Sequence, residues 1–586
     1  MEISLMKEKQ RSSLEKSGRN IFSAKRSSKN PPYSEKSGTI HIHKLRSLWY
    51  TKNRTINANE EEWHMSMHND DGLSLLEKGK NGLLHVLFGK MGIVLLLLAL
   101  QLVILFGIFL RFEQFLPHIY GGTTVFTVIM VLYLINSDMD PTAKITWMVL
   151  IMLLPVFGGL LYLFTEKEWG HRAMKKRLKD SVALEQKELP QEQQTLDVLK
   201  QVDAGAANMC RYVRSTGYYP VYQNTAVTYF PLGEMKFDKL MQEMEAAKQY
   251  IYLEYFIIEE GHMWGKILDV LVRKAAEGVD IRVLYDGTLE FTRLPKGYTQ
   301  MLAELGIHAK VFSKVTPIVS THYNYRDHRK IAVIDGHTAF TGGVNISDEY
   351  INWTHPYGHW KDTAVMLKGE AAQSFALMFL QMWNLDQKQE HLELPEIPQT
   401  NVTSTGFVMP YGESPLDDHK VGKRIYIDIL NRAQNYVYIM TPYLIIDAEM
   451  ENTLKYAAKR GIDVTMILPG IPDNPAAHSL ARTHYKTLLD SGVKILEYTP
   501  GFVHAKVMVA DDQEAVVGTI NFDYRSLYHH FECATYLNRV DAIREIKKDF
   551  LETATKCQTW NYEMLRADKW YIKAMGRLLK VIAPLM

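Results

Sequence analysis

Two stretches of the sequence carry the same five residue types at the same internal spacing. One reads HRKIAVIDGHTAFTGGVN and the other reads HAKVMVADDQEAVVGTIN. The shared residues are His328, Lys330, Asp335, Gly342 and Asn345 in the first stretch and His504, Lys506, Asp511, Gly518 and Asn521 in the second. A repeated set of this size indicates two copies of one functional unit.

Each copy is suited to binding a phosphate group. On a strand, alternate residues project from one face, so the histidine and the lysine of HxK point toward the same ligand. The apolar runs IAVI and VMVA continue the strand into a core. The glycine permits close backbone approach, and the asparagine amide can donate to a phosphate oxygen.

Two such units predict phosphodiester chemistry that needs no metal and no cofactor. One neutral histidine attacks phosphorus and forms a phosphohistidine, while the other histidine, protonated, donates to the leaving alkoxide, and the roles then reverse. The substrate phosphate is expected to bind the four remaining polar side chains, which offset its developing charge: Lys330, Asn345, Lys506 and Asn521.

The sequence indicates no other cofactor or partner site of a recognised type. It contains no GxxxxGK[ST] loop, no GxGxxG after a strand, no HExxH and no EF-hand loop. The adjacent His529 and His530 should point apart on a helix or a strand, which disfavours a metal site made by both. With 67 Lys+Arg against 66 Asp+Glu there is no overall basic field for nucleic acid. The three scattered cysteines indicate neither a disulfide framework nor structural zinc.

The elements that position these motifs are expected to form an α/β fold with a mainly parallel sheet. From about residue 200, short β-branched runs alternate with helical stretches, as in βαβ units. YIYLEYFII, AAEGVDIRVLYDG and LAELGIHAKVF are matched later, in the same order, by YVYIMTPYLII, AAKRGIDVTMILPG and LLDSGVKILEY. We therefore expect a first half at 200–395, a second half at 396–586, and one pseudo-twofold catalytic unit between them.

The first part of the chain predicts a tail followed by a membrane region. Residues 1–85 are expected to form a basic, disordered tail, because the first 57 residues hold thirteen Lys or Arg against four Asp or Glu. This tail either attracts anionic lipid headgroups or helps to set topology. Residues 86–166 are expected to form transmembrane helices from the apolar runs 91–110, 119–135 and 145–164.

The charges that flank these runs leave the membrane topology open. Lys and Arg cluster both before the first run and after the third, and three spans cannot place both flanks in the cytoplasm. We expect a multi-pass protein of the cell membrane with a cytoplasmic catalytic portion.

The paired HxKxxxxDxxxxxxGxxN motifs resemble those of the phospholipase D superfamily, and the chain from about residue 85 onward resembles bacterial cardiolipin synthases. The stretches IYLEYFI, HWKDT and NFDYRSLYHHFE also agree with that family. Three features depart from it: the long basic tail with an extra apolar run, and Gly343 and Thr519 where serine is common.

The resemblance implies transfer of a phosphatidyl group from one phosphatidylglycerol to another, which yields cardiolipin and glycerol. It implies His328 as nucleophile and His504 as general acid, with the reverse assignment left open. The remaining site residues are given supporting roles: Asp335 and Asp511 act electrostatically, Glu532 orients a histidine, and Glu254 lines the pocket.

Several alternatives remain at this stage. The same chemistry serves other phosphatidyltransferases, phospholipases and nucleases, and a non-catalytic lipid-binding scaffold is a further alternative. Anionic lipid headgroups are expected partners, and nucleic acid is not. A monomer is chemically sufficient, with an oligomer left open. The C-terminal stretch from Trp570 to Met586 either lies on the bilayer or packs on the catalytic portion.

Overall fold

The computed structural model describes residues 103, 106–107, 110–111, 122–166, 175–180, 189–313, 325–385, 402, 404–417 and 419–585. The expected tail at 1–85 and most of the apolar run 91–110 lie outside these residues.

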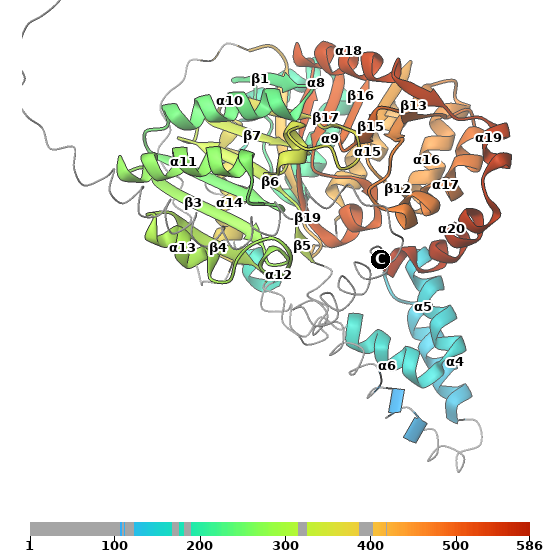
Figure 1. Ribbon diagram of the computed structural model, residues 1–586. Helices are drawn as coiled ribbons and strands as arrows, with labels where there is room; N and C mark the ends of the chain where they lie inside the picture. Colours follow the sequence, from blue (N-terminus) through green and yellow to red (C-terminus); the bar gives the residue numbers. More distant parts are fainter. Residues whose placement is uncertain are drawn as a thin grey trace, which may run out of the picture. The chain divides into compact units, whose positions relative to one another are not determined.

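The two halves build sheets with the same strand order, one coloured green to yellow and the other orange to red in Figure 1. The first sheet has the order β1-β9-β7-β6-β2-β3-β4, and the second begins with the equivalent series β10-β19-β17-β16-β11-β13-β14 and adds β20. The strands of the first half are β1 (Thr225–Phe230), β2 (Tyr250–Tyr255), β3 (Asp280–Asp286), β4 (His308–Phe312), β5 (Arg326–Asp327), β6 (Lys330–Ile334), β7 (Thr338–Gly342), β8 (His359–Lys361) and β9 (Ala364–Gly369). Those of the second are β10 (Phe407–Glu413), β11 (Tyr436–Met440), β12 (Leu444–Ile445), β13 (Asp463–Pro469), β14 (Lys494–Tyr498), β15 (Gly501–Val503), β16 (Val507–Ala510), β17 (Glu514–Gly518), β18 (Phe522–Asp523), β19 (His530–Asn538) and β20 (Cys557–Thr559). This equivalence confirms the predicted tandem halves.

The sheets are mixed, so the prediction of a mainly parallel sheet was wrong. Strands β2, β3 and β4 are parallel, whereas β6 runs antiparallel to β2 and to β7. The reason lies in the motif itself: Asp335 and Gly336 both have positive φ, as in the tight turns that join antiparallel strands. Asp511 and Asp512 turn the chain in the same way between β16 and β17.

Helices accompany both sheets. In the first half they are α10 (Gly233–Ala246), α11 (His262–Ala276), α12 (Leu289–Thr292), α13 (Tyr298–Glu304), η3 (Asp348–Ile351) and α14 (Ala372–Trp383). In the second they are α15 (Val421–Arg432), α16 (Ala448–Lys459), α17 (Pro475–Leu489), η4 (Arg525–His529), α18 (Ala542–Ala554), α19 (Tyr562–Ala567), α20 (Trp570–Ile582) and η5 (Ala583–Leu585). α14 is mostly apolar and is buried along nearly all of its length, which is typical of a helix between two packed layers.

One hydrophobic core joins the halves. Its cluster contains Val333 and Val365 of the first sheet together with Val509 and Val516 of the second. Helices α8 (Gln193–Val202) and α9 (Ala204–Gly217) precede the first sheet, yet α9 packs against α15 and β10 of the second half. The two halves therefore share one packed interior and are not independent domains.

Within the membrane region, residues 122–166 form three short apolar helices, α4 (Gly122–Ile135), α5 (Pro141–Leu153) and α6 (Pro155–Glu166). The apolar run 145–164 is thus divided between two helices rather than forming the expected single helix. Pro155 has no amide hydrogen and begins α6, and Leu154 leaves helical geometry with φ of −136°. Within the described residues, no helix combines the length and apolar character that crossing a bilayer requires.

Candidate active site

Each catalytic histidine candidate is held by backbone bonds to the opposite half. β5, just before His328, pairs in parallel with β19 of the second half, and the His328 amide donates to the Phe531 carbonyl at 2.9 Å. β15, just before His504, pairs in parallel with β8 of the first half, and the His504 amide donates to the Lys361 carbonyl at 2.8 Å. Each half thus pairs a strand with the other half next to its own histidine, so the packing of the two halves fixes the backbone position of both histidines.

The histidine side chains cross the same interface. Nδ1 of His328 lies 2.9 Å from both carboxylate oxygens of Glu532. Nδ1 of His504 lies 2.6 Å from Oδ2 of Asp362. All four side chains are buried. Because each carboxyl group engages Nδ1, Nε2 of each imidazole is the nitrogen left for substrate.

The two carboxyl groups are held in different ways. Glu532 accepts hydrogen bonds from the hydroxyls of Thr519 and Ser526. Asp362 accepts one from the Thr363 amide at 2.8 Å. A β-carbon on Gly343 would lie 2.0 Å from Oδ1 of Asp362, so Gly343 leaves the space that this carboxyl group occupies. The two positions where serine is common are thus explained by the carboxyl groups beside them. Gly343 leaves room for Asp362, and Thr519 donates a hydrogen bond to Glu532.

The proton balance differs between the two pairs. Burial raises the pKa of Asp362 to about 7, although Lys506 partly opposes this. Burial would also raise the pKa of Glu532. However, the nearby His328 and the hydrogen bonds that Glu532 accepts hold this pKa well below its usual value. Burial lowers the pKa of His328 to about 3 and that of His504 well below its usual value. Glu532 is therefore an acceptor that fixes Nδ1–H on His328, whereas the Asp362–His504 pair can retain a proton near neutral pH.

The two motif lysines bring a second pair of groups to the histidines. The Lys330 ammonium donates to the His328 carbonyl at 2.6 Å, and Lys506 makes the same bond to the His504 carbonyl. Burial lowers the pKa of Lys330 to about 7 and that of Lys506 to about 8. Each ammonium also lies close enough to influence the site of the other half, so a bound anion would relieve their repulsion.

The two motif asparagines, Asn345 and Asn521, are also buried. Asn345 accepts from the Ile257 amide at 3.1 Å and donates to the Tyr350 hydroxyl at 2.8 Å. Asn521 donates to Asp523 at 3.2 Å, and its side-chain oxygen has no hydrogen-bond partner among the described residues. Each amide nitrogen keeps one hydrogen for a further acceptor.

The motif aspartates lie at the other end of their strands. Asp335 follows β6 and accepts from the backbone amides of residues 248, 249 and 250 at 2.7–3.0 Å. Asp511 follows β16 and accepts from the amides of residues 434, 435 and 436 at 2.6–2.9 Å. At about 3.3 Å per residue, a strand of this length separates Asp335 from Lys330 by roughly 16 Å. This placement gives the aspartates a turn-stabilising role, which differs from the electrostatic role expected from the sequence.

Glu254 does not share a face with the motif lysine. It is opposite Ile331 in the β2–β6 ladder, while the neighbouring Tyr255 is opposite Lys330. Its carboxyl group lies 3.9 Å from the buried guanidinium of Arg329, and burial raises its pKa far above the usual value. The expected pocket-lining role is thus replaced by a place in a buried polar group beneath the sheet.

One set of side chains has the composition of a metal site. Ligand atoms of His328, His530 and Glu532 all lie within 4.8 Å of one another. Among the described residues, neither ring nitrogen of the buried His530 has a hydrogen-bond partner, and Nδ1 is 3.7 Å from Glu532. His529 instead points to the Pro584 carbonyl at 3.4 Å. A divalent ion bound by the three would take the Nδ1 and the carboxylate that His328 and Glu532 use for each other.

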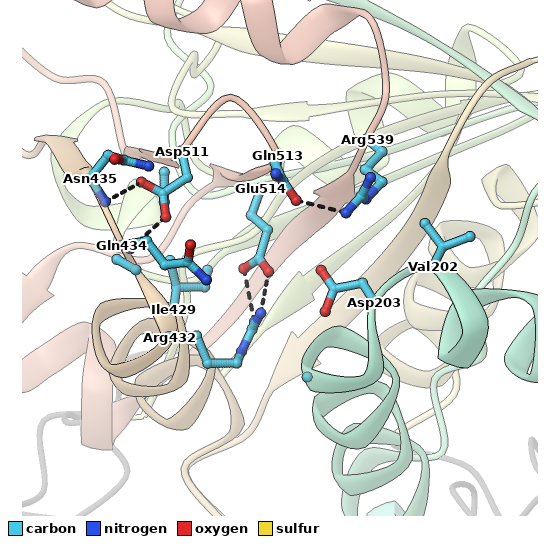
Figure 2. A pocket seen from close by; sticks show the side chains of 13 residues that line it. Val202, Asp203, Ile429, Arg432, Gln434, Asn435, Asp511, Gln513, Glu514 and Arg539 are labelled. Atoms are coloured by element: carbon cyan, nitrogen blue, oxygen red, sulfur yellow. Dashed lines mark hydrogen bonds and ion pairs between the residues drawn. The ribbon is translucent and has the colours of Figure 1, made fainter.

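A cavity of about 440 Å³ lies around Asp511, at the end of β16 remote from Lys506. Figure 2 shows both of its arginines engaged by neighbouring side chains: Arg432 pairs with Glu514, and Arg539 donates to the side-chain oxygen of Gln513. Asp203 also lines the cavity and caps helix α9. Because these charges are already partnered, the cavity offers no counterpart to the histidine cluster.

Sequence reasoning overlooked Asp362 and the aromatic surroundings of the histidines. Asp362 belongs to HWKDT, which the resemblance included without giving its aspartate a role. His504 packs against Tyr350 and Trp360, with ring centroids at 5.3 and 5.5 Å, and His328 packs against Phe256 at 5.1 Å. The signal that identifies Asp362 is its reciprocity with Glu532, which appears only when the halves are docked.

Comparison with known proteins identifies two matching family models. The model described as "Cardiolipin synthase, PLD-like domain" matches residues 240–383 and 426–554, and the model described as "Phospholipase_D-nuclease N-terminal" matches residues 125–165. The first match covers both histidine motifs and both carboxyl partners.

Relatives align over most of the chain. A protein of Streptococcus mutans serotype c named "Uncharacterized protein" is 51% identical over 458 residues, covering 78% of this chain and 99% of its own. The cardiolipin synthase of Halalkalibacterium halodurans is 30% identical over 512 residues, covering 85% of this chain and 99% of its own. Cardiolipin synthase 2 of Bacillus anthracis is 32% identical over 467 residues, covering 78% and 89%. The chain therefore belongs to the phospholipase D-like cardiolipin synthase family.

Proposed function

We propose that this protein is a cardiolipin synthase that transfers a phosphatidyl group from one phosphatidylglycerol to the free hydroxyl of another. Family membership supports the reaction type. The observation that carries the mechanism is the reciprocal pairing of His328 with Glu532 and of His504 with Asp362 across the two halves.

In the first step, Nε2 of His328 attacks the phosphorus of the donor lipid. Ionised Glu532 keeps the proton on Nδ1 and stabilises the positive charge that develops on the ring. The phosphorus–oxygen bond to the headgroup glycerol breaks, and the Asp362–His504 pair delivers its proton to the leaving alkoxide through Nε2 of His504. Lys330 and Lys506 offset the charge on the phosphoryl oxygens.

In the second step, neutral His504 accepts the proton of the incoming hydroxyl group of a second phosphatidylglycerol. That oxygen attacks phosphorus, and the bond to His328 breaks, so the enzyme returns to its starting protonation state. Asn345 and Asn521 each retain an amide hydrogen for the phosphoryl oxygens during both steps. The reverse assignment of the histidines has less support because Glu532, and not Asp362, has the lowered pKa.

The lipid substrate places the enzyme at a membrane. The apolar runs at 91–110, 119–135 and 145–164 support attachment to the cell membrane, with a multi-pass topology and a cytoplasmic catalytic portion as the finer proposal. The site needs one chain, since all four reacting side chains and both lysines come from it.

The test is to supply purified protein in liposomes with phosphatidylglycerol and EDTA, without nucleotide, and to follow lipids and glycerol by mass spectrometry. Cardiolipin and glycerol in equal amounts are expected, because each transfer releases one glycerol. EDTA and the absence of nucleotide should not prevent the reaction, because lysines supply the positive charge and the reaction uses no activated donor. Phosphatidic acid as the main product would instead identify water as the acceptor and the protein as a phospholipase. No product from folded protein would contradict both reactions and favour a lipid-binding scaffold.

A further inference from the structure

Helix α20 is fastened to the catalytic unit by one of its faces. A β-carbon on Gly576 would lie 2.3 Å from the carbonyl of Ser479 in α17, so the two helices are in close backbone contact there. Leu579 and Ala583 join a small cluster with Leu480 and Tyr524. The helix is therefore a fixed part of the second half.

Much of the remaining surface of α20 is apolar and exposed. The exposed fractions of Trp570 and Leu578 are 79% and 69%. Large exposed apolar side chains recur along the helix: Trp570, Tyr571, Met575, Leu578, Val581 and Ile582. Residues 571, 575, 578 and 582 follow the three- and four-residue spacing of one helical face. A contiguous exposed patch of this kind marks an interaction surface.

The charged residues of α20 indicate which kind of partner would bind this apolar surface. Lys573, Arg577 and Lys580 form a stripe that borders Trp570 and Val581 and lies opposite residues 571, 575, 578 and 582. Lys580 lies 4.0 Å from Glu451 of α16, and no Asp or Glu occurs from residue 569 to the end of the sequence. Lysine and arginine beside an apolar face, with tryptophan and tyrosine at one end, are typical of helices that lie in a membrane interface. The basic residues are complementary to anionic headgroups.

The apolar face adjoins a second apolar surface. Thr146 of α5 donates to the Val581 carbonyl of α20 at 2.7 Å. α5 itself exposes Ile145, Val149 and Met152. The two helices thus present apolar side chains on either side of a hydrogen-bonded contact.

The same contact region leads directly to the histidine cluster. In η4, Tyr528 lies 3.5 Å from Asp140, the residue that caps α5, and His529 lies 3.4 Å from Pro584 just beyond α20. η4 is followed at once by β19, which carries Glu532 to His328. A lipid surface at α5 and α20 would therefore lie next to a wall of the active site.

We propose that α20 lies in the plane of the bilayer interface, with its apolar face among the acyl chains and its basic stripe on anionic phospholipid. This contact orients the catalytic unit on the membrane and adds to whatever anchoring the N-terminal apolar runs provide. It goes beyond the proposed transfer reaction, because it is a binding property that can be measured without turnover.

The chain offers a matched control for the test. Leu551 of α18 is 44% exposed on a helix of the same half, while Leu578 is the exposed leucine on α20. Leu578→Cys and Leu551→Cys, each combined with Cys557→Ser, are labelled with a polarity-sensitive fluorophore in the full-length protein. The proteins are reconstituted into vesicles of phosphatidylcholine and phosphatidylglycerol that carry a spin label on the acyl chain.

The label at Leu578 should shift to the blue and be quenched by the acyl spin label at least about twofold more than the label at Leu551, since only α20 inserts. Equal and weak quenching at both positions would overturn the proposal. Protection of the Leu578 label without lipid, increasing with protein concentration, would also overturn it and indicate a contact between copies of the chain. A strongly quenched label in an inactive protein would keep this proposal and contradict the proposed reaction.

A second pair of variants connects the contact to activity. Leu578→Glu should raise the apparent KM for vesicle phosphatidylglycerol about tenfold, because one inserted leucine is worth roughly a decade in affinity. Leu551→Glu should change it less than about twofold. Equal KM values for the two variants would contradict the proposed role of α20.

Discussion

Asp362 and His504 share a 2.6 Å hydrogen bond although 142 residues separate them in the chain. The pair has a counterpart in Glu532 and His328, which are joined across the same interface in the opposite sense. The consequence is that neither half by itself supplies a motif histidine together with its carboxyl partner. Catalysis by this chain depends on docking of its halves as much as on its motifs.

Asp362→Asn should lower cardiolipin formation at least about 100-fold, because a neutral amide neither stores the proton nor balances an imidazolium. Glu532→Gln should cause a loss of similar size. Steady-state assays on phosphatidylglycerol vesicles, with circular dichroism to verify folding, provide the measurement.

The matched control for these variants is Glu451→Gln. Glu451 accepts from Nδ1 of His484 at 2.7 Å, a histidine–carboxylate pair of the same kind in α16 and α17. Its loss should leave turnover within about twofold. A comparable fall in Glu451→Gln would show that such pairs act through stability rather than through chemistry.

The pH dependence follows from the groups with lowered or raised pKa. Asp362 and Lys330 have pKa values of about 7, and Lys506 has one of about 8. As pH rises through this range, the free enzyme loses the proton of the Asp362–His504 pair and the charges that bind phosphate. kcat/KM should therefore fall progressively above about pH 7.

Stability should move in the opposite direction over the same range. The folded lysines have pKa values below the unfolded value of 10.5, so the unfolded chain binds more protons between about pH 7 and pH 10. The free energy of unfolding that these groups contribute thus rises with pH. A rate that stays constant to about pH 9, or one that falls together with the melting temperature, would contradict the assignment.

Asp335→Ala and Asp511→Ala should act on stability. Each removes a carboxylate that accepts from three backbone amides at a tight turn, which should cost roughly 3 kcal/mol of unfolding free energy. Turnover per folded molecule should stay within about threefold of wild type. Asp512→Asn, at the next residue but half-exposed, is the control and should cost less than about 0.5 kcal/mol. A fully folded but inactive Asp335→Ala protein would restore the electrostatic role predicted from the motif.

The interface between halves contains a buried ion pair that should be needed for its integrity. Lys361 of β8 lies 2.7 Å from Asp549 of α18, which also accepts from Tyr229 at 2.6 Å. Lys361→Met should lower the free energy of unfolding by about 3–5 kcal/mol, because it leaves Asp549 buried with one neutral partner.

The double variant Lys361→Met/Asp549→Leu should recover most of that loss, since no unpaired charge remains. Urea unfolding in detergent provides the comparison. If the double variant is as unstable as the single one, the loss comes from packing and not from the stranded carboxylate.

The duplicated fold was predictable because its signals are local. Glycines 278, 306, 461 and 492 all have positive φ at the ends of helices, as their place between helical and β-branched runs predicts. The strand direction is also predictable from the sequence, because Asp335–Gly336 between two apolar runs is a strong hairpin signal that argues against a mainly parallel sheet. The break of the third apolar run at Pro155 is a similar local signal, because proline lacks the amide hydrogen that a continuous helix needs, although membrane helices tolerate proline.

The complete site was less predictable, because the carboxyl partner of each histidine comes from the other half of the chain. The HxK spacing identifies His328 and Lys330, and the same spacing identifies their equivalents in the second half. Asp362 carries no such pattern, and its role depends on β8 pairing with β15 across the interface. The failure with Glu254 has the same origin, since only the register of β2 against β6 shows which face it occupies.

The central claim is that the phosphatidyl group passes through His328. Wild-type protein mixed with phosphatidylglycerol, quenched within milliseconds under alkaline denaturing conditions that preserve phosphohistidine, and mapped by peptide mass spectrometry would locate the adduct. A phosphatidyl adduct on the peptide that contains His328, absent from His328→Ala and chased into cardiolipin by fresh phosphatidylglycerol, is the predicted result. An adduct on the His504 peptide, or product formation at the wild-type rate by His328→Ala, would contradict it.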